Sequence, residues 1–271
     1  MAKAAAQLHA ACVARFQAAC AFLEDEFERE KILELEPLRD PPQMEARMQL
    51  GLVALACRLG ADGRFRNCIV FERAPHGATK RFLDIVTRAR ARPSTLAGHP
   101  LEMPHAFKYI IDPSDNRLTP EQELQFVRHR VAAFPESPAA WDDLAFLLAR
   151  NVTEGPEYPG VLRRLNELAP RYWWAANELA WLEVQAGQYA KALPLATMAQ
   201  AEAPVNPYVL KTLAATLRGL GRCAEAIADQ RRAVERLPKE WPEPERARFA
   251  RVLTEYQQQC TEGVTAAPRS H

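Results

Sequence analysis

The 271-residue sequence contains little glycine and no excess of charge of either sign. Its 11 glycines are outnumbered by 21 prolines, so proline rather than glycine marks most turns and helix ends. Lys and Arg number 35 and Asp and Glu number 34, which excludes a global field that would attract nucleic acid or an anionic membrane. No apolar run approaches the roughly 18 residues of a membrane span. A hydrophobic fraction of 48% excludes a wholly disordered chain.

The sequence motifs of common enzyme classes are also absent. There is no Walker loop, no G-x-G-x-x-G fingerprint, no G-x-S-x-G elbow and no kinase signature. The adjacent carboxylates Asp142 and Asp143 would point about 100° apart on a helix. That divergence suits a solvated face better than a general acid and base pair. We therefore expect no enzymatic activity and no cofactor.

The cysteines and histidines show no metal-binding spacing. No C-x-x-C pair and no H-E-x-x-H motif occurs, so we expect neither a metal site nor a disulfide framework. Most of the cysteines have apolar neighbours and are predicted to be buried, unpaired side chains; they are Cys12, Cys20, Cys57, Cys68, Cys223 and Cys260. Such cysteines, together with the absence of a secretory hydrophobic stretch, predict a cytoplasmic location.

Prolines recur at a fixed period in the C-terminal half. Pro135, Pro170, Pro204 and Pro238 are separated by 35, 34 and 34 residues, and each one follows a helical apolar pattern. Residues 173–206 and 207–240 also match position for position; the pairs are Leu179 with Leu213, Ala180 with Ala214, Gly187 with Gly221, Ala192 with Ala226, Ala199 with Ala233, and Pro204 with Pro238. The period and the small residues predict stacked pairs of antiparallel helices.

With these residues, the segment from about 120 to 260 resembles the tetratricopeptide-repeat (TPR) family. The resemblance implies an all-α, right-handed solenoid of helix-turn-helix units. Residues 138–172 form a weaker unit, and Thr119 to Phe134 resembles the second helix of a still earlier one, opening with Thr119 as N-cap and Pro120. A polar helix from about Glu243 to Gln259 would cap the array. Pro194 departs from the pattern and is expected to kink or shorten its helix.

The N-terminal half is expected to be an irregular helical lobe. We predict one helix over residues 2–36, a second from Met44 to Leu59, and an irregular crossing over residues 91–116. The alternation from Phe65 to Phe71 would equally permit a short strand. The predicted organisation is a helical lobe over residues 1–118, a solenoid with its capping helix over 119–262, and a disordered tail over 263–271.

A basic segment lies between residues 64 and 92. Its eight cations are opposed by only two acids, and no nucleic-acid motif accompanies them. We expect a solvated face that pairs with the acidic residues between 24 and 36 of the same chain. A phosphate or nucleic-acid patch is the alternative, and we regard nucleic-acid binding as the less favoured of the two.

The resemblance also implies a binding groove, because the first helix of each TPR unit lines a concave surface that holds a peptide or a partner helix. Carried onto this sequence, the groove residues are Phe146, Trp174, Asn177, Trp181, Val184, Tyr208, Lys211 and Arg218. Asn177 would bind a partner's backbone amide, and Lys211 and Arg218 would bind a carboxylate. Asp142 stands where the relatives that bind chaperone tails need a lysine, which disfavours that ligand. Alternatively, Trp174 and Trp181 pack as core against the N-terminal lobe.

Two functions from different classes follow. The favoured one is a non-catalytic adaptor that binds an acidic or apolar peptide of a protein partner in the groove. The alternative is an enzyme or nucleic-acid-binding module in residues 1–118, with the solenoid as a docking arm. Neither function predicts an oligomeric state.

Overall fold

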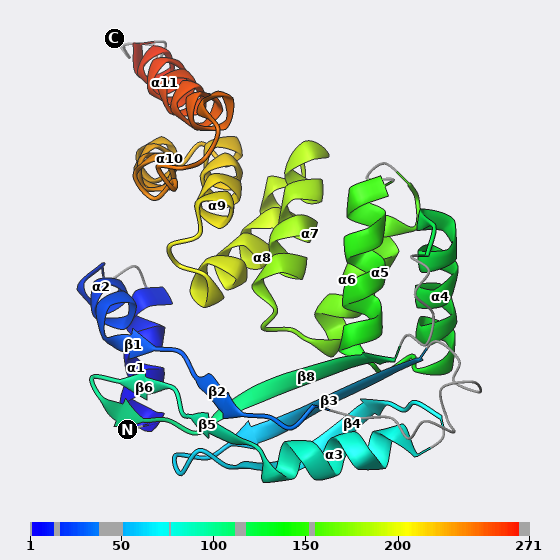
Figure 1. The fold of residues 1–271 in the computed structure, drawn as a ribbon. Helices are drawn as coiled ribbons and strands as arrows, with labels where there is room; N and C mark the ends of the chain where they lie inside the picture. The colour runs from blue at the N-terminus through cyan, green and yellow to red at the C-terminus, as the bar shows by residue number, and fades with distance from the viewer. Residues whose placement is uncertain are drawn as a thin grey trace. The chain divides into compact units, whose positions relative to one another are not determined.

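The computed structural model describes residues 2–13, 17–37, 51–75, 77–111, 118–151 and 155–265. The chain divides into two compact units, one of residues 1–11 with 16–161 and one of residues 12–15 with 162–271. Their boundary falls at residues 161 and 162, whereas the sequence suggested a boundary at 118 and 119. The first unit mixes strands and helices, and the second is built from helices (Figure 1).

The first unit contains a three-stranded antiparallel sheet in the order β4-β3-β8. Two further small sheets have the orders β1-β6-β7 and β2-β5. The elements of this unit are α1 (Ala2–Val13), α2 (Gln17–Glu26), β1 (Phe27–Glu28), β2 (Lys31–Glu34), β3 (Gly51–Leu59), β4 (Phe65–Glu72), α3 (Ala78–Arg88), β5 (Arg90–Arg92), β6 (Thr95–Leu96), β7 (His99–Pro100), β8 (Met103–Ile111), α4 (Pro120–Ala133) and α5 (Pro138–Asn151). Helix α6 (Tyr158–Leu168) spans the boundary between the units, and residues 12–13 at the end of α1 are also assigned to the second unit.

Strand β3 replaces the C-terminal part of the helix that we expected from Met44 to Leu59, so that prediction is wrong for residues 51–59; residues 44–50 lie outside the described part. Alternate residues of β3, such as Val53 and Leu55, face one core together with Phe82 and Val86 of α3. Leu52 and Ala54 on the other face are buried as well. A strand buried on both faces has a continuous apolar run, which periodicity alone does not distinguish from a buried helix.

The expected helical lobe is corrected at two further places. The helix predicted over residues 2–36 is helical only as α1 and α2 among the described residues, and the chain then forms β1 and β2. The predicted irregular crossing contains β5, β6, β7 and the nine-residue strand β8, which pairs with β3. The strand allowed by the alternation from Phe65 to Phe71 is confirmed as β4. Because pairing partners lie far apart in the sequence, as Gly51 and Ile111 do, local pattern does not reveal them.

The second unit has the helical pairs that the 34-residue period predicts. These are α7 (Trp173–Gln185) with α8 (Tyr189–Glu202), α9 (Pro207–Gly219) with α10 (Cys223–Glu235), and the final helix α11 (Glu243–Thr265). The small residues of the matched positions are fully buried: Ala180, Ala192, Ala199, Ala214, Ala226 and Ala233. Gly187 and Gly221 both adopt positive φ, at 70° and 74°, directly after α7 and α9. The helical half therefore has the TPR fold, and the prediction of an α-solenoid is confirmed there.

Helix boundaries follow the sequence at the start of α4 and differ from it at α8 and α11. Helix α4 begins with a capping box in which the Thr119 hydroxyl accepts from the Gln122 backbone and the Gln122 side chain accepts from the Thr119 backbone. Helix α8 continues through Pro194, so the expected shortening does not occur. Helix α11 reaches Thr265, beyond the predicted end at Gln259. Most of the predicted disordered tail, residues 266–271, lies outside the described residues.

The prediction of unpaired cysteines is wrong. Cys57 of β3 and Cys68 of β4 form a disulfide, and Cys223 of α10 and Cys260 of α11 form another. Cys12 and Cys20 are disulfide-bonded too, which leaves no free cysteine in the described part of the chain. The partners of the two named disulfides are 11 and 37 residues apart and meet only through strand pairing or helix packing, so sequence spacing did not reveal them.

Candidate functional site

A pocket between α7 and α9 gathers most of the predicted groove residues. We call it the Lys211 pocket; it has a volume of about 350 Å³ and is lined by Trp173, Trp174, Asn177, Glu178, Trp181, Tyr208, Lys211 and Thr212. Five of the predicted groove residues therefore lie together: Trp174, Asn177, Trp181, Tyr208 and Lys211. Their spacing of three and four residues along each helix puts them on one face.

Lys211 is the cation of this pocket and is surrounded by aromatic rings. Its Nζ lies 4.3 Å from the ring centroid of Trp181, 5.6 Å from that of Tyr208 and 5.8 Å from that of Phe249 in α11. Burial, reinforced by the positive charge of Arg248, lowers the pKa of Lys211 below its usual value. Among the described residues, Lys211 makes no hydrogen bond or ion pair, so its charge is balanced only by aromatic faces and more distant carboxylates.

Asn177 supplies an unused hydrogen-bond acceptor to the same pocket. The residue is only 5% exposed, and its Oδ1 accepts no hydrogen bond from the described residues. A buried polar atom without a hydrogen-bond partner destabilises the protein by on the order of 1–3 kcal/mol, unless a ligand supplies the missing hydrogen bond. A peptide N–H is a donor of the required kind.

Trp174 and Trp181 are both half-buried within the second unit and line the pocket. Tyr208 is 38% exposed, and its hydroxyl donates to Glu245 Oε1 of α11 at 2.9 Å. Burial, followed by the nearby Glu245 carboxylate, raises the pKa of Tyr208. The tyrosine therefore remains a neutral hydrogen-bonding group at ordinary pH.

The other predicted groove residues lie outside the Lys211 pocket. Arg218 donates from Nη2 to Oε1 of Gln259 in α11, at 3.1 Å. Val184 is half-buried near the end of α7. Phe146 belongs to α5 of the first unit and is 54% exposed, with the Arg150 guanidinium 5.9 Å from its ring centroid.

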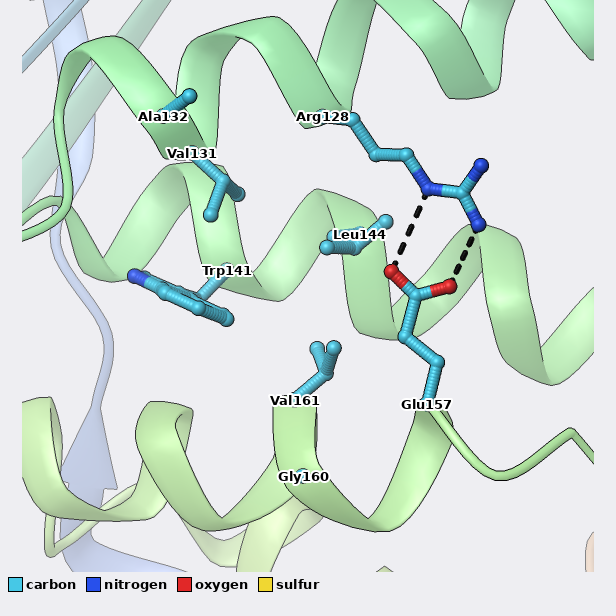
Figure 2. Close-up of a pocket in the computed structure, with 8 residues that line it drawn as sticks. All are labelled: Arg128, Val131, Ala132, Trp141, Leu144, Glu157, Gly160 and Val161. Carbon is cyan, nitrogen blue, oxygen red and sulfur yellow. Dashed lines mark hydrogen bonds and ion pairs between the residues drawn. The ribbon is translucent and has the colours of Figure 1, made fainter.

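The first unit has a cavity of its own among α4, α5 and α6. Its volume is about 430 Å³, and its lining residues are Arg128, Val131, Ala132, Trp141, Leu144, Glu157, Gly160 and Val161. Figure 2 shows the apolar side chains converging from the three helices, with the Arg128–Glu157 ion pair at one end. The Trp141 indole is oriented by a hydrogen bond from Nε1 to the carbonyl oxygen of Pro135. The charges that line this cavity are paired with each other, so they do not select a ligand.

A buried ionic network in the first unit was missed by sequence reasoning. Arg130 of α4 donates from Nε and Nη2 to Glu72 of β4, at 2.7 and 2.9 Å, and from Nη1 to Asp143 of α5, at 2.6 Å. Ser137 also donates to Glu72, and Lys108 of β8 pairs with Asp143. Burial would lower the pKa of Arg130, but the hydrogen bonds to Glu72 and Asp143 outweigh it and raise the pKa. The network joins the sheet to α4 and α5.

A second polar cluster contains Ser94, Glu30 and His105. Glu30 lies between the other two: Ser94 Oγ donates to its Oε2 at 2.7 Å, and His105 Nδ1 lies 2.9 Å from its Oε1. His105 is on β8, not in a loop as the prolines around it suggested. A nucleophilic serine would need to donate to a base such as histidine, whereas here it donates to the carboxylate. The arrangement anchors residue 30 to β8 and is not a catalytic triad.

The basic segment is paired with carboxylates of the same unit. Arg66 contacts Asp62, Lys80 contacts Asp84, and Arg88 contacts Glu36 of the acidic segment. Strand β2 of the acidic segment also pairs with β5 of the basic one. The Arg88–Glu36 ion pair and the β2–β5 pairing join the basic segment to the acidic one as predicted, whereas the Arg66 and Lys80 pairs are local.

The part of the chain that the structure describes has neither a metal-ligand cluster nor a membrane-spanning helix. No group of three or more His, Cys, Asp or Glu residues there could hold a metal ion. None of its helices has the length and hydropathy needed to traverse a bilayer.

Comparison with known proteins gives structural similarities alone. No protein-family model and no curated protein matches the sequence. Among solved structures, a MamA RS-1 double mutant aligns with 55% of this chain and 80% of its own, at 21% identity and a TM-score of 0.45. MamA residues 41 to the end, from Desulfovibrio magneticus RS-1, align with 55% of this chain and 88% of their own, at 18% identity and a TM-score of 0.39. TTC0263, a TPR protein of Thermus thermophilus, aligns with 50% of this chain and 73% of its own, at 24% identity and a TM-score of 0.38.

Proposed function

We propose that this protein is a non-catalytic adaptor that binds an acidic, partly apolar peptide segment of a protein partner in the Lys211 pocket. The observation that carries the proposal is the half-buried Lys211, whose ammonium lies against Trp181 without a carboxylate partner among the described residues. An incoming carboxylate would supply that partner, and a charge-assisted hydrogen bond of this kind contributes about 1.5–3 kcal/mol.

The rest of the pocket fits an extended peptide. The rings of Trp174, Trp181 and Tyr208 offer flat apolar surfaces of the kind that dominate peptide interfaces. Asn177 Oδ1 would accept from a backbone N–H of the ligand. A cavity of about 350 Å³ accommodates one or two side chains, so specificity would depend on a short stretch of acidic and apolar residues.

The proposal is tested with three fluorescein-labelled peptides, each about 12 residues long, that alternate Leu with Glu, with Gln or with Lys. The Leu/Glu peptide is expected to bind most tightly and the Leu/Lys peptide not at all, measured by fluorescence anisotropy at about 150 mM salt. Lys211→Met removes the charge but keeps the length of the side chain, and should weaken the Leu/Glu peptide by roughly 10- to 100-fold.

Lys191→Met is the matched control, because Lys191 is an exposed lysine of α8 outside the pocket. It should leave the affinity unchanged. Equal affinity of the wild type for all three peptides, or equal losses in the two variants, would reject the Lys211 pocket as the binding site.

A further inference from the structure

Helix α11 forms part of the environment of Lys211. The Phe249 ring contributes one of the three aromatic faces around the Lys211 ammonium, and it also contacts the Tyr208 ring at 5.6 Å between centroids. Glu245 accepts the hydrogen bond from the Tyr208 hydroxyl. The positions of the ammonium and of the Tyr208 ring therefore depend on how firmly α11 is held.

Two kinds of contact hold α11 in place. Near its start, Phe249 is fully buried against Leu210 and Ala233, and Gln230 donates from Nε2 to the Phe249 carbonyl oxygen at 2.9 Å. Near its end, the Cys223–Cys260 disulfide ties it covalently to α10. The side chains of residues 251–259 are half-buried or exposed, so the C-terminal turns have little apolar packing beyond Tyr256.

The Cys223–Cys260 disulfide is also within reach of a reductant. Cys223 is half-buried and Cys260 is 9% exposed; the Cys57–Cys68 disulfide has a similar pattern, with Cys57 at 2% and Cys68 half-buried, so solvent exposure alone does not distinguish the two. A dithiol reductant would attack one sulfur as the thiolate and form a mixed disulfide, and its second thiol would displace the protein sulfur. The balance is one protein disulfide and one dithiol giving two protein thiols and one oxidised dithiol.

We propose that the Cys223–Cys260 disulfide regulates the Lys211 pocket, with the oxidised protein as the high-affinity form. The proposal rests on the function proposed above and adds that the redox state of this disulfide regulates peptide binding. In the oxidised form α11 keeps Phe249 and Glu245 against Lys211 and Tyr208. In the reduced form α11 is held by its noncovalent contacts alone. Phe249 and Glu245 are then held less firmly against Lys211 and Tyr208.

The proposal also bears on where the protein acts. Disulfides persist in oxidising compartments and are rare in the cytosol. The expectation of a cytoplasmic location had two grounds, unpaired cysteines and the absence of a secretory hydrophobic stretch, and the first is removed because the described cysteines are all paired. A protein of this design binds its partner in an oxidising compartment and releases it where dithiols are abundant.

The test compares full-length oxidised wild type, wild type reduced with a phosphine, the double variant Cys223→Ser/Cys260→Ser, and the matched control Cys57→Ser/Cys68→Ser. Two quantities are measured: amide hydrogen exchange over residues 207–218 and 243–260, and affinity for the Leu/Glu peptide. Reduced wild type and the Cys223/Cys260 variant should exchange faster in both segments and bind at least about fivefold more weakly. The control should match oxidised wild type in both.

Unchanged exchange in both the reduced wild type and the Cys223/Cys260 variant overturns the proposal, whatever the affinity. If oxidised wild type fails to bind the peptide, the proposed function is wrong, and exchange over residues 207–218 alone decides the redox control. Faster exchange there supports it, and unchanged exchange rejects it. Reduced wild type also covers the case in which the serine variant fails to fold.

Discussion

Arg130 of α4 and Glu72 of β4 form a bidentate ion pair that is almost completely buried. The two hydrogen bonds measure 2.7 and 2.9 Å, and the side chains are 5% and 0% exposed. Removing one partner leaves the other charge in the interior. We expect Arg130→Met or Glu72→Gln to destabilise the first unit by about 3–5 kcal/mol, measured by urea unfolding of the full chain.

The double variant Glu72→Gln/Arg130→Met is the informative comparison for this pair, because it removes both charges together. It should lose less stability than the sum of the two single changes. Arg164→Met, at an exposed ion pair with Glu167, should change stability by less than about 1 kcal/mol. Additive losses in the double variant would mean that the pair is not energetically coupled.

Gly219 and Gly160 are helical glycines with opposite surroundings. A Cβ at Gly219 would clash with the Tyr189 ring, 2.2 Å from its Cδ1, whereas a Cβ at Gly160 would meet no atom within 4 Å. Gly219→Ala should destabilise the second unit by about 1–3 kcal/mol because the Tyr189 ring must move. Gly160→Ala should stabilise the chain by about 0.5–1 kcal/mol through helix propensity. Thermal unfolding of the two variants distinguishes these effects. A Gly219→Ala variant that is more stable than the wild type would show that the Tyr189 ring can move aside without cost.

Peptide binding should depend on the protonation of Lys211. Because burial and Arg248 lower the pKa of Lys211, the ammonium loses its proton at a lower pH than an ordinary lysine near 10.5. Affinity for the Leu/Glu peptide should therefore fall as the pH rises through this lowered pKa. Arg248→Gln removes a like charge and should raise the pKa, so that binding persists to higher pH. NMR titration of the labelled lysine side chain measures the shift directly; an unshifted Lys211 resonance would contradict the explanation.

Glu30, in the cluster with Ser94 and His105, should lose its negative charge only at low pH. Burial alone would raise the pKa of Glu30, but the hydrogen bonds from Ser94 and His105 outweigh it and lower the pKa below 4.5. The cluster therefore contributes stability above that ordinary value, and the contribution is lost as the pH falls through the lowered pKa. Ser94→Ala should raise the pKa of Glu30, as seen by carboxyl NMR. Thr95→Val, which changes only an exposed contact to Glu28, should not shift it.

The TPR half could be read from the sequence because its determinants are local. Ala192 and Ala226, or Gly187 and Gly221, act within one helical pair, and their 34-residue repetition makes them visible. The aromatic and cationic residues of the Lys211 pocket were expected from the resemblance to the TPR family, which places groove residues on the first helix of each unit. The surroundings of the pocket could not be predicted in this way. Phe249 and Glu245 contact Lys211 and Tyr208 because α11 packs against α9 and α10, and no periodic pattern in the sequence indicates that packing.

The N-terminal half was misread where long-range pairing determines structure. The run from Gly51 to Leu59 suits a buried helix as well as a strand, and only its pairing with β4 and β8 decides between them. Cys57 and Cys68 were judged by their apolar neighbours, which say nothing of the bond between them. Glu72 and Arg130 are separated by 58 residues, and no local pattern indicates that they meet.

The ionic contact between β4 and α4 also affects how the chain can be divided. A cut at residues 118 and 119, where the repeat pattern begins, would leave Glu72 on one fragment and Arg130 on the other. Each fragment would expose a charged group that is buried in the intact chain, together with the apolar surface around it. Fragments with such exposed apolar surface tend to aggregate. Truncations that keep the first 161 residues intact avoid this separation, so the start of the repeats is not the place where the polypeptide becomes independent.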